Sequence, residues 1–270
     1  MVRGLWTAAS GMTSQQLNVD TIANNLANIN TTGYKKETTN FKSLLYQTME
    51  SANVPNAQAP TSMQVGHGVR ALSNSRNYSP GIPQQTGKNT DMAIEGKGFF
   101  TVLKGEQMTY TKDGSFRISV TEDGSYALVT SDGDPILSTE DESILIGTDV
   151  PSEKVIVGKD GEVYYMDEET KTKMNIAQLK IVQFANIEGL EAIGSNLFIQ
   201  TAASGEPLVE GDADGLVKSN IQTGFLEGSN VQVAEEMVKL IVAQRAYELN
   251  STAIKTVDTM LQQANELKRG

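Results

Sequence analysis

The sequence has no cysteine among its 270 residues and only one histidine, His67. The absence of cysteine excludes disulfides, zinc–thiolate sites and cysteine nucleophiles, and a lone histidine excludes a metal site made of clustered imidazoles. No apolar run approaches the ~20 residues of a transmembrane helix. The N-terminal residues turn polar too early for the apolar region of a signal peptide, which has about 7–15 residues. We therefore expect neither a membrane span nor a cleaved signal peptide.

Positive charge is scarce in the middle of the chain. The whole sequence has 22 Lys and Arg against 33 Asp and Glu, a net charge of −11. Residues 120–170 contain 14 acidic and two basic residues, so this stretch carries −12 and the remainder about +1. A nucleic-acid binder needs a basic stripe, which this distribution argues against. The acidic stretch is typical of a solvated surface that keeps a protein soluble.

Apolar side chains recur every seven residues near the N-terminus. One series occupies Leu5, Met12, Val19 and Leu26, and a second, offset by three residues, occupies Ala8, Gln15, Ile22 and Ile29. This pattern over four heptads predicts a long amphipathic helix, with Gln15 as its one polar member. The helix is expected to stop near Asn30–Gly33, where β-branched residues and a glycine end the pattern.

The C-terminal region shows the same spacing. Val233, Leu240, Tyr247, Ile254 and Leu261 recur every seven residues, and Ala243, Val257 and Ala264 hold the offset positions, with Glu236 and Asn250 as polar exceptions. Asn230 is predicted to cap the start of this helix, while Lys268 and Arg269 at its end suit the helix dipole. A helix of ~35 residues would be about 50 Å long, which is more than a small globular core needs.

The apolar residues at heptad spacing on the two terminal segments define what we call the seam. Its members are Leu5, Met12, Val19, Ile22, Leu26, Ile29, Val233, Leu240, Tyr247, Ile254, Val257 and Leu261. Packing within one chain and association between copies would both bury such a seam. The pattern leaves both open, because small and polar members do not fix the number of partners.

Short β-strands separated by turns are predicted for the centre of the chain. Asp-Gly pairs at 113–114, 123–124, 132–133 and 160–161 are typical of tight turns. The expected strands are a buried strand after Gly98 and the segments Met108–Thr111, Ser115–Val120, Tyr126–Thr130, Val155–Val157 and Gln178–Phe184. Glu50–Pro60 has no clear period and is expected to be a flexible linker or an extended arm.

These patterns together predict an α+β fold. Long N- and C-terminal heptad helices are expected to pack as a coiled coil, with an all-β domain inserted between them. The expected parts are 1–35 with 228–270 as the helical domain, 36–75 as an extended arm or linker, and 76–227 as the β-rich domain.

Few segments point to chemistry. Residues 210–215 resemble the opening of a calcium-binding loop, but Ile221 stands where the loop requires a bidentate glutamate. Carboxylate pairs for glycoside hydrolysis lack an aromatic-lined context, since Trp6 is the only tryptophan. We predict no catalytic, cofactor-binding or metal-binding residues and no cofactor. A calcium-binding surface protein, or an enzyme built on the β domain, remains the alternative class.

Several motifs in colinear order resemble those of bacterial flagellar rod and hook proteins. They are Ala23–Asn28, Thr32–Lys35, Asp91–Phe100, Tyr110–Phe116, Gly189–Phe198, Ser229–Val238 and Gln244–Asn250. The signature residues of the two ends are Asn24, Asn25, Asn28, Gly33, Gln244, Arg245 and Tyr247. Leu44–Thr48 with Gln64–Arg70 is similar to the distal-rod members of the family. The acidic stretch Ser138–Glu169 departs from their pattern, which leaves a proximal-rod or other rod paralogue open.

The resemblance implies a structural subunit without enzyme activity. It implies polymerisation into a hollow helical rod in the basal body, with the terminal helices inside and the β domain outside, that carries torque from motor to hook. The implied partners are copies of the chain, other rod and hook proteins, surrounding ring proteins and the flagellar export apparatus, but no nucleic acid. The implied location is the cell envelope, reached by export without a cleaved signal peptide.

Overall fold

The computed structural model describes residues 2–50, 63–121, 124–147, 155–166, 172–211 and 216–267. The chain divides into two compact units. Unit 1 contains residues 1–27, 37–77 and 232–270, and unit 2 contains residues 28–36 and 78–231. Two helices and many strands make the chain a mixed α+β protein, as the sequence predicts. The coiled-coil packing and the predicted domain boundaries stay predictions.

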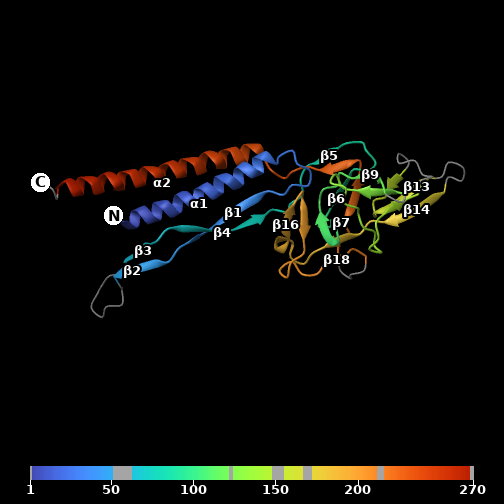
Figure 1. Cartoon of the computed structure of the whole chain (residues 1–270), viewed down its shortest axis with the longest axis horizontal. Helices are drawn as coiled ribbons and strands as arrows, with labels where there is room; N and C mark the ends of the chain where they lie inside the picture. The colour runs from blue at the N-terminus through green and yellow to red at the C-terminus, as the bar shows by residue number, and fades with distance from the viewer. Residues whose placement is uncertain are drawn as a thin grey trace. The chain divides into compact units, whose positions relative to one another are not determined.

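Two long helices, α1 (Val2–Ala27) and α2 (Val233–Leu267), belong to unit 1. They lie side by side and antiparallel (Figure 1). Neither contains proline, and Glu235 and Glu236 lie in the first turn of α2, where the helix dipole favours negative charge. None of the helices that the structure describes is long and apolar enough to cross a membrane.

The boundaries of both helices differ from those expected. α1 ends at Ala27, so Ile29, a predicted seam residue, lies in the turn that follows and not on the helix. α2 begins at Val233, three residues after Asn230. The prediction that Asn230 caps this helix is therefore wrong. Its side chain is used elsewhere, where it accepts a hydrogen bond from the Lys36 backbone N–H at 2.8 Å.

A two-stranded ribbon completes unit 1. β1 (Glu37–Ser43) pairs antiparallel with β4 (Val69–Arg76), and β2 (Tyr46–Glu50) pairs with β3 (Met63–Gly66). The hydroxyls of Thr39 in β1 and Thr21 in α1 lie 2.8 Å apart, so α1 covers one face of the ribbon. Most of the predicted linker Glu50–Pro60 lies outside the described residues.

Unit 2 is built from antiparallel strands. Its largest sheet has the order β16-β17-β8-β7-β15-β18, made by Glu191–Gly194, Leu197–Ile199, Gln107–Thr111, Phe99–Lys104, Ile181–Gln183 and Leu208–Val209. Two three-stranded sheets follow: β11-β10-β9 (Leu145–Ile146, Tyr126–Val129, Arg117–Val120) and β12-β13-β14 (Val155–Val157, Glu162–Met166, Lys173–Gln178). Two further pairs are β6 (Met92–Glu95) with β19 (Asn220–Thr223), and β5 (Pro83–Gln85) with β20 (Phe225–Glu227).

The expected strands are recovered with one exception. Gln178–Phe184, expected as one strand, is divided between β14 and β15, because Leu179 leaves the ladder to bridge Ser138. The Asp-Gly turn at 160–161 joins β12 to β13, and Gly161 has the positive φ of 84° that glycine tolerates. The predicted turn at 123–124 falls partly outside the described residues.

Strand β7 separates two hydrophobic cores. Successive side chains of a strand point to opposite faces, so the neighbours Phe99 and Phe100 enter different clusters. Phe100 stacks edge-on against Phe116, with ring centroids 4.9 Å apart. Phe99 packs edge-on against Phe184 and Phe198, with centroids 5.9 and 6.0 Å away. Both phenylalanines of β7 are fully buried.

Candidate assembly surfaces and polar clasps

Two pairs of positions show how α1 and α2 approach each other in unit 1. A Cβ built on Gly4 would lie 3.9 Å from Val257, and one built on Gly11 would lie 2.9 Å from Asn250. Seven residues forward along α1 are therefore matched by seven residues back along α2. The heptad spacing of both helices is the spacing that such antiparallel packing uses.

Burial of the seam is uneven. Ile22 is buried, and Leu5, Met12, Val19, Leu26, Ile29, Leu240, Ile254, Val257 and Leu261 are half-buried. Val233 and Tyr247 remain exposed. The small residues Ala8 and Ala243, at the offset heptad positions, are buried and let the helices approach closely. One chain thus covers its own seam only in part.

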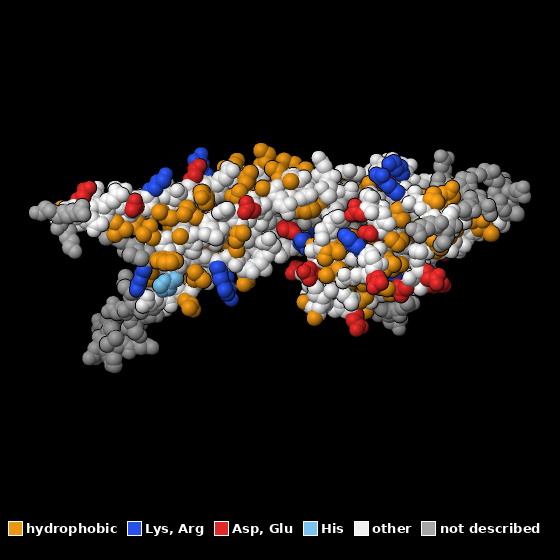
Figure 2. Space-filling view, viewed as in Figure 1, with side chains coloured by type: hydrophobic (Ala, Val, Ile, Leu, Met, Phe, Trp, Pro, Cys, Tyr) orange, Lys and Arg blue, Asp and Glu red, His pale blue; other side chains and the backbone are white. Residues whose placement is uncertain are grey.

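A second apolar face runs along the first half of α2. Its apolar members are Met237, Val238, Ile241, Val242 and Leu249, which are all exposed, and the exposed Arg245 lies among them. At 100° per residue these positions lie on the side of α2 opposite the half-buried Leu240 and the buried Ala243. Hydrophobic side chains gather over the first turns of α2 in the space-filling view (Figure 2). We call this set the outer face of α2. A helix that is apolar on two opposite sides needs a second partner to cover it.

The N-terminal signature residues divide into internal and exposed ones. Asn28 accepts a hydrogen bond from the Thr31 hydroxyl at 3.1 Å, which helps to turn the chain after α1. Gly33 has a φ of 69°, and a Cβ there would lie 2.8 Å from the Asp113 backbone nitrogen, so only glycine fits. Asn24 is exposed and borders a groove between α1 and the ribbon, beside Leu17 and Leu72.

The C-terminal signature residues are exposed on α2. Gln244 and Tyr247 line a shallow groove between the helices together with Gln16 and Val19 of α1. Arg245 forms an ion pair with Glu248, with 2.8 Å between Nη1 and Oε2, and both side chains are largely exposed. Such a surface pair contributes little to stability, typically about 0–1 kcal/mol.

Asn25, near the end of α1, is the centre of a buried network of polar side chains. Its amide nitrogen donates to the Glu37 carbonyl at 2.8 Å, and its amide oxygen accepts from the Glu37 N–H at 2.9 Å. The same nitrogen donates to Glu236 Oε2 at 3.1 Å, and Asn25 and Glu236 are each 1% exposed. Arg76 pairs with the Glu37 carboxylate at 2.5 Å. We call Asn25, Glu37, Arg76 and Glu236 the Asn25 clasp.

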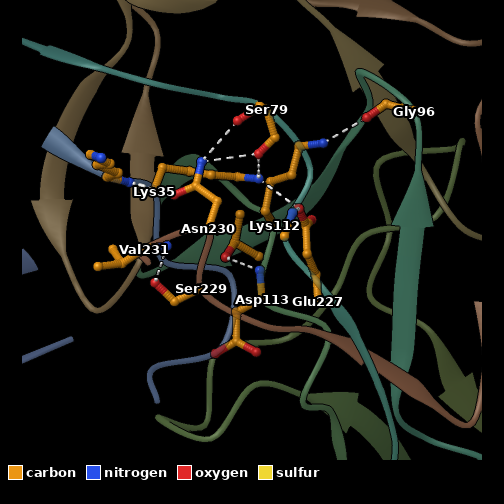
Figure 3. Close-up of polar contacts among 12 residues, drawn as sticks. Lys35, Ser79, Gly96, Lys112, Asp113, Glu227, Ser229, Asn230 and Val231 are labelled. Carbon is orange, nitrogen blue, oxygen red and sulfur yellow. Dashed lines mark hydrogen bonds and ion pairs between the residues drawn. The ribbon is translucent and has the colours of Figure 1, made fainter. Parts of the chain in front are cut away.

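A second buried polar group lies in unit 2 (Figure 3). Lys35 Nζ lies 2.6 Å from Glu227 Oε1 and donates to the Ser79 carbonyl at 2.9 Å. The Lys35 side chain is 0% exposed and that of Glu227 is 5% exposed. The Gly81 N–H donates to the same Glu227 oxygen at 2.9 Å. Asn230 donates to the Ser79 carbonyl at 3.1 Å. We call Lys35, Ser79, Glu227 and Asn230 the Lys35 clasp.

Lys112 adjoins this clasp. It donates to the Gly96 carbonyl at 2.8 Å and lies 5.2 Å from the centroid of the Phe99 ring. The pKa of Lys112 is lowered to about 8, mainly by burial; the Glu227 carboxylate opposes this lowering and the neighbouring Lys35 cation adds to it. Burial also raises the pKa of Asp113, which the hydrogen bond from the Ser115 N–H opposes.

The segment compared with a calcium loop has a different role where it is described. Glu210 accepts hydrogen bonds from the Ser219 N–H and hydroxyl, both at 2.7 Å, and from Gln183 at 2.7 Å. Residues 212–215 lie outside the described residues. Within the part of the chain that the structure describes, no three His, Asp or Glu side chains are placed to hold a metal ion.

Sequence reasoning missed the pairing of Lys35 with Glu227 and of Asn25 with Glu236. Lys35 was part of a motif, and Glu236 was a polar exception in a heptad pattern. A charged residue at an apolar heptad position was the available signal, because such a residue is expected to find a buried partner. The identity of that partner, far away in sequence, does not follow from spacing.

Three family models match separate parts of the chain. "Flagella basal body rod protein" matches residues 5–35. "Flagellar hook protein FlgE/F/G D1 domain" matches residues 93–165. "Flagellar basal body rod FlgEFG protein C-terminal" matches residues 222–267. The two terminal matches cover most of α1 and all of α2, and the central match lies in unit 2.

Several relatives match over nearly their whole length. The flagellar basal-body rod protein FlgG of Borreliella burgdorferi is 45% identical over 273 residues, covering 100% of both chains. FlgG of Bacillus subtilis is 37% identical over 271 residues, again covering 100% of both. The flagellar hook-basal body complex protein FlhP of Bacillus subtilis is 32% identical over 279 residues, covering 99% of this chain and 100% of that protein.

Proposed function

Because the chain belongs to the flagellar basal-body rod protein family, and is a structural subunit of the bacterial flagellar rod, we propose that many copies polymerise through their terminal helices. The polymer is a hollow helical shaft in the distal part of the rod, and it transmits torque from motor to hook. This role requires no reaction and no cofactor. The proposal rests on the family together with the two apolar sides of α2.

The outer face of α2 is the observation that carries the proposal. Full burial of an exposed Val, Ile, Leu or Met side chain contributes about 1.5–3 kcal/mol, and the five side chains of this face, which are 51–71% exposed, have roughly half or more of that left to gain. Five such side chains on one helix therefore supply a contact that repeats in every subunit. If the covering surface is a different part of the next copy, the contact is heterologous and continues into a filament, since nothing closes it into a dimer.

The half-buried seam supports coiled-coil packing as part of the same proposal. The seven-for-seven match of α1 and α2 is compatible with knobs-into-holes packing, and residues left exposed, such as Tyr247, are available to neighbouring copies. In this arrangement residues 1–35 and 228–270 form the assembling part, 36–75 the arm and 76–227 the β-rich part. We place the acidic stretch 120–170 on the outside of the shaft, because its charge of −12 would repel copies packed along the axis.

Partners and location follow from the same role. The subunit is a component of the basal body and assembles with other rod and hook proteins. We further propose contacts with surrounding ring proteins, and passage through the flagellar export apparatus into the envelope. Retention of the N-terminal helix is part of this proposal, because α1 from Val2 onward packs on α2 and its removal would expose the seam.

A matched pair of substitutions tests the assembly surface. Val238→Asp on α2 and Val120→Asp on β9 each place a carboxylate at an exposed valine, with 60% and 64% exposed fractions. Val238→Asp is expected to leave the circular dichroism of the monomer unchanged but to abolish rods in purified basal bodies, and with them swimming. Val120→Asp is expected to leave assembly intact. Normal rods with Val238→Asp would rule out the outer face of α2 as an assembly surface.

A paralogous position in the basal body is the second candidate. The 32% identity to FlhP, named a hook-basal body complex protein, favours it. Electron microscopy of basal bodies with a label on unit 2 separates the two. A label next to the hook supports the distal rod, and a label elsewhere along the axis supports the paralogue.

A further inference from the structure

The chain passes between its two units four times. The passages fall between residues 27 and 28, 36 and 37, 77 and 78, and 231 and 232. The backbone alone would join the units at four separate points, and each point could be pulled independently. The residues next to these points are, however, bonded to one another on both sides.

In unit 1, the Asn25 clasp takes one residue from beside each passage. Asn25 is in the last turn of α1, Glu37 begins β1, Arg76 ends β4, and Glu236 is in the first turn of α2. The two hydrogen bonds between Asn25 and the Glu37 backbone tie the first two passages together. Arg76, beside the third passage, is joined to this pair by its ion pair with Glu37. Glu236, beside the fourth passage, is joined to it by the hydrogen bond from Asn25.

In unit 2, the Lys35 clasp joins the three segments that lead to the passages. Lys35 belongs to segment 28–36, which joins two of the passages. Ser79 follows the third passage, and Glu227 and Asn230 precede the fourth. The ion pair of Lys35 with Glu227, and the bonds of both Lys35 and Asn230 to the Ser79 carbonyl, connect all three segments (Figure 3).

The two clasps are bonded to adjacent backbone N–H groups at the second passage, between residues 36 and 37. The Lys36 N–H donates to Asn230 in unit 2, and the next N–H along the chain, that of Glu37, donates to Asn25 in unit 1. Only Asn77 and Tyr78 separate Arg76 from Ser79. At the second and third passages, little free backbone therefore lies between the groups that hold the chain on one side and those that hold it on the other.

Buried charge suits this position for a physical reason. Replacing a buried ion pair by apolar residues of similar size is often neutral or stabilising, so such a pair is weak evidence for a stability role. An ion pair with added hydrogen bonds does fix geometry, since each donor has a defined acceptor. Glu227 meets this description, because its Oε1 accepts from both Lys35 and Gly81.

We propose that the two clasps make the four passages share mechanical force between unit 1 and unit 2. Force applied at the entrance of α2 passes through Asn230 and Glu227 to segment 28–36 and to Ser79, so no single passage is pulled alone. Lys35, Glu227, Asn25 and Glu236 are positioning residues in this device. The inference rests on the proposed function only in that a rod subunit experiences torque.

The test combines hydrogen exchange with swimming. Glu227→Gln keeps the shape and an acceptor but removes the charge, and the double variant Lys35→Met with Glu227→Leu replaces the pair by apolar side chains. In the full-length chain we expect amide exchange in segments 28–36, 78–81 and 227–231 to accelerate at least tenfold. Exchange in β7 and β8 should stay unchanged. In cells, swimming should slow more in viscous medium than in dilute medium.

Two controls separate the outcomes. Glu248→Gln breaks the exposed pair with Arg245 and should leave exchange in the three segments unchanged. Unchanged exchange in the three segments would overturn the proposal, as would acceleration spread evenly over unit 2, which indicates only a stability role. If the unsubstituted chain is absent from purified rods, the proposed function fails instead, and the exchange result stands independently of it.

Discussion

The two units bury hydrophobic surface to very different extents. Among the described residues, 30 hydrophobic side chains are buried, and only Ala8, Ile22 and Ala243 of these belong to unit 1. Of the 24 large hydrophobic side chains that are exposed, 15 belong to unit 1. Unit 2 thus has its own cores, whereas unit 1 has two helices and a ribbon with most of their apolar surface uncovered. The comparison teaches that unit 2 has the buried cores of a self-contained fold, whereas unit 1 leaves exposed the apolar surface on which the proposed association depends.

Charge follows the same division. Unit 1 has nine Lys and Arg against eight Asp and Glu, a net charge of +1, and unit 2 has 13 against 25, a net charge of −12. Near-neutral surfaces can approach copies of themselves without strong repulsion, while a strongly acidic surface stays hydrated and apart. Apolar exposure and charge therefore assign association to the same unit.

The largest expected effect compares one core position in each unit. Phe100→Ala in unit 2 removes a fully buried ring and should lower the free energy of unfolding of that unit by about 3–5 kcal/mol. Ile22→Ala should shift only the unfolding of the helix pair. Both α-helices that the structure describes belong to unit 1, so the helical circular dichroism signal follows unit 1 and near-ultraviolet circular dichroism of the aromatic clusters follows unit 2. Equal changes of both signals in both variants would show that the two units unfold together, which would contradict independent folding of unit 2.

A smaller effect concerns the cation buried inside the acidic unit. The pKa of Lys112 is about 8 in the folded chain and 10.5 ordinarily. Between pH 8 and pH 10.5, unfolding is therefore accompanied by the uptake of a proton. The contribution of Lys112 to the free energy of unfolding therefore rises as pH increases from 8 to 10.5, by at most about 3 kcal/mol. Lys112→Met should remove this rise, as measured by denaturant unfolding of unit 2 across that range.

Its control is Lys104→Met, which removes an exposed lysine of the same unit. That variant is expected to keep the pH dependence of the unsubstituted chain. Measurements end near pH 10, because burial raises the pKa of Tyr110 and its ionisation adds a trend of opposite sign at higher pH. A parallel pH dependence for Lys112→Met and the unsubstituted chain would show that burial does not control this lysine.

The smallest effect sharpens the packing of unit 1. Gly4→Ala gains up to about 1 kcal/mol of helix propensity, and its Cβ makes an ordinary contact 3.9 Å from Val257. Gly11→Ala has the same intrinsic gain, but its Cβ would lie 2.9 Å from the Asn250 amide, so the helices must separate or Asn250 must move. Thermal unfolding followed by the helical circular dichroism signal should give Gly4→Ala a higher melting temperature than Gly11→Ala. The reverse order would mean that Asn250 moves freely.

Periodic features could be predicted from the sequence, and long-range partners could not. Heptad spacing located both helices, and Asp-Gly turns located the hairpin at 160–161, because both signals act within a few residues. Asn230 was assigned to a helix start on local grounds, but the Lys36 N–H, far away in sequence, recruits it instead. Likewise the pairing of β1 with β4 spans a long loop that no local pattern encodes. The residues expected to form contacts between copies stay predictions, because a single chain supplies only one of the two surfaces of each contact.

The adjacent rings of Phe99 and Phe100 have a thermodynamic consequence. Strand β7 is a wall common to both cores of unit 2, so neither core can open without displacing the backbone that holds the other. A locally melted form with one core intact is therefore costly, and the two cores should be lost in one all-or-none step. Calorimetry of unit 2 would then record a single peak whose measured enthalpy equals its van't Hoff enthalpy, although the unit contains two separate clusters of aromatic side chains.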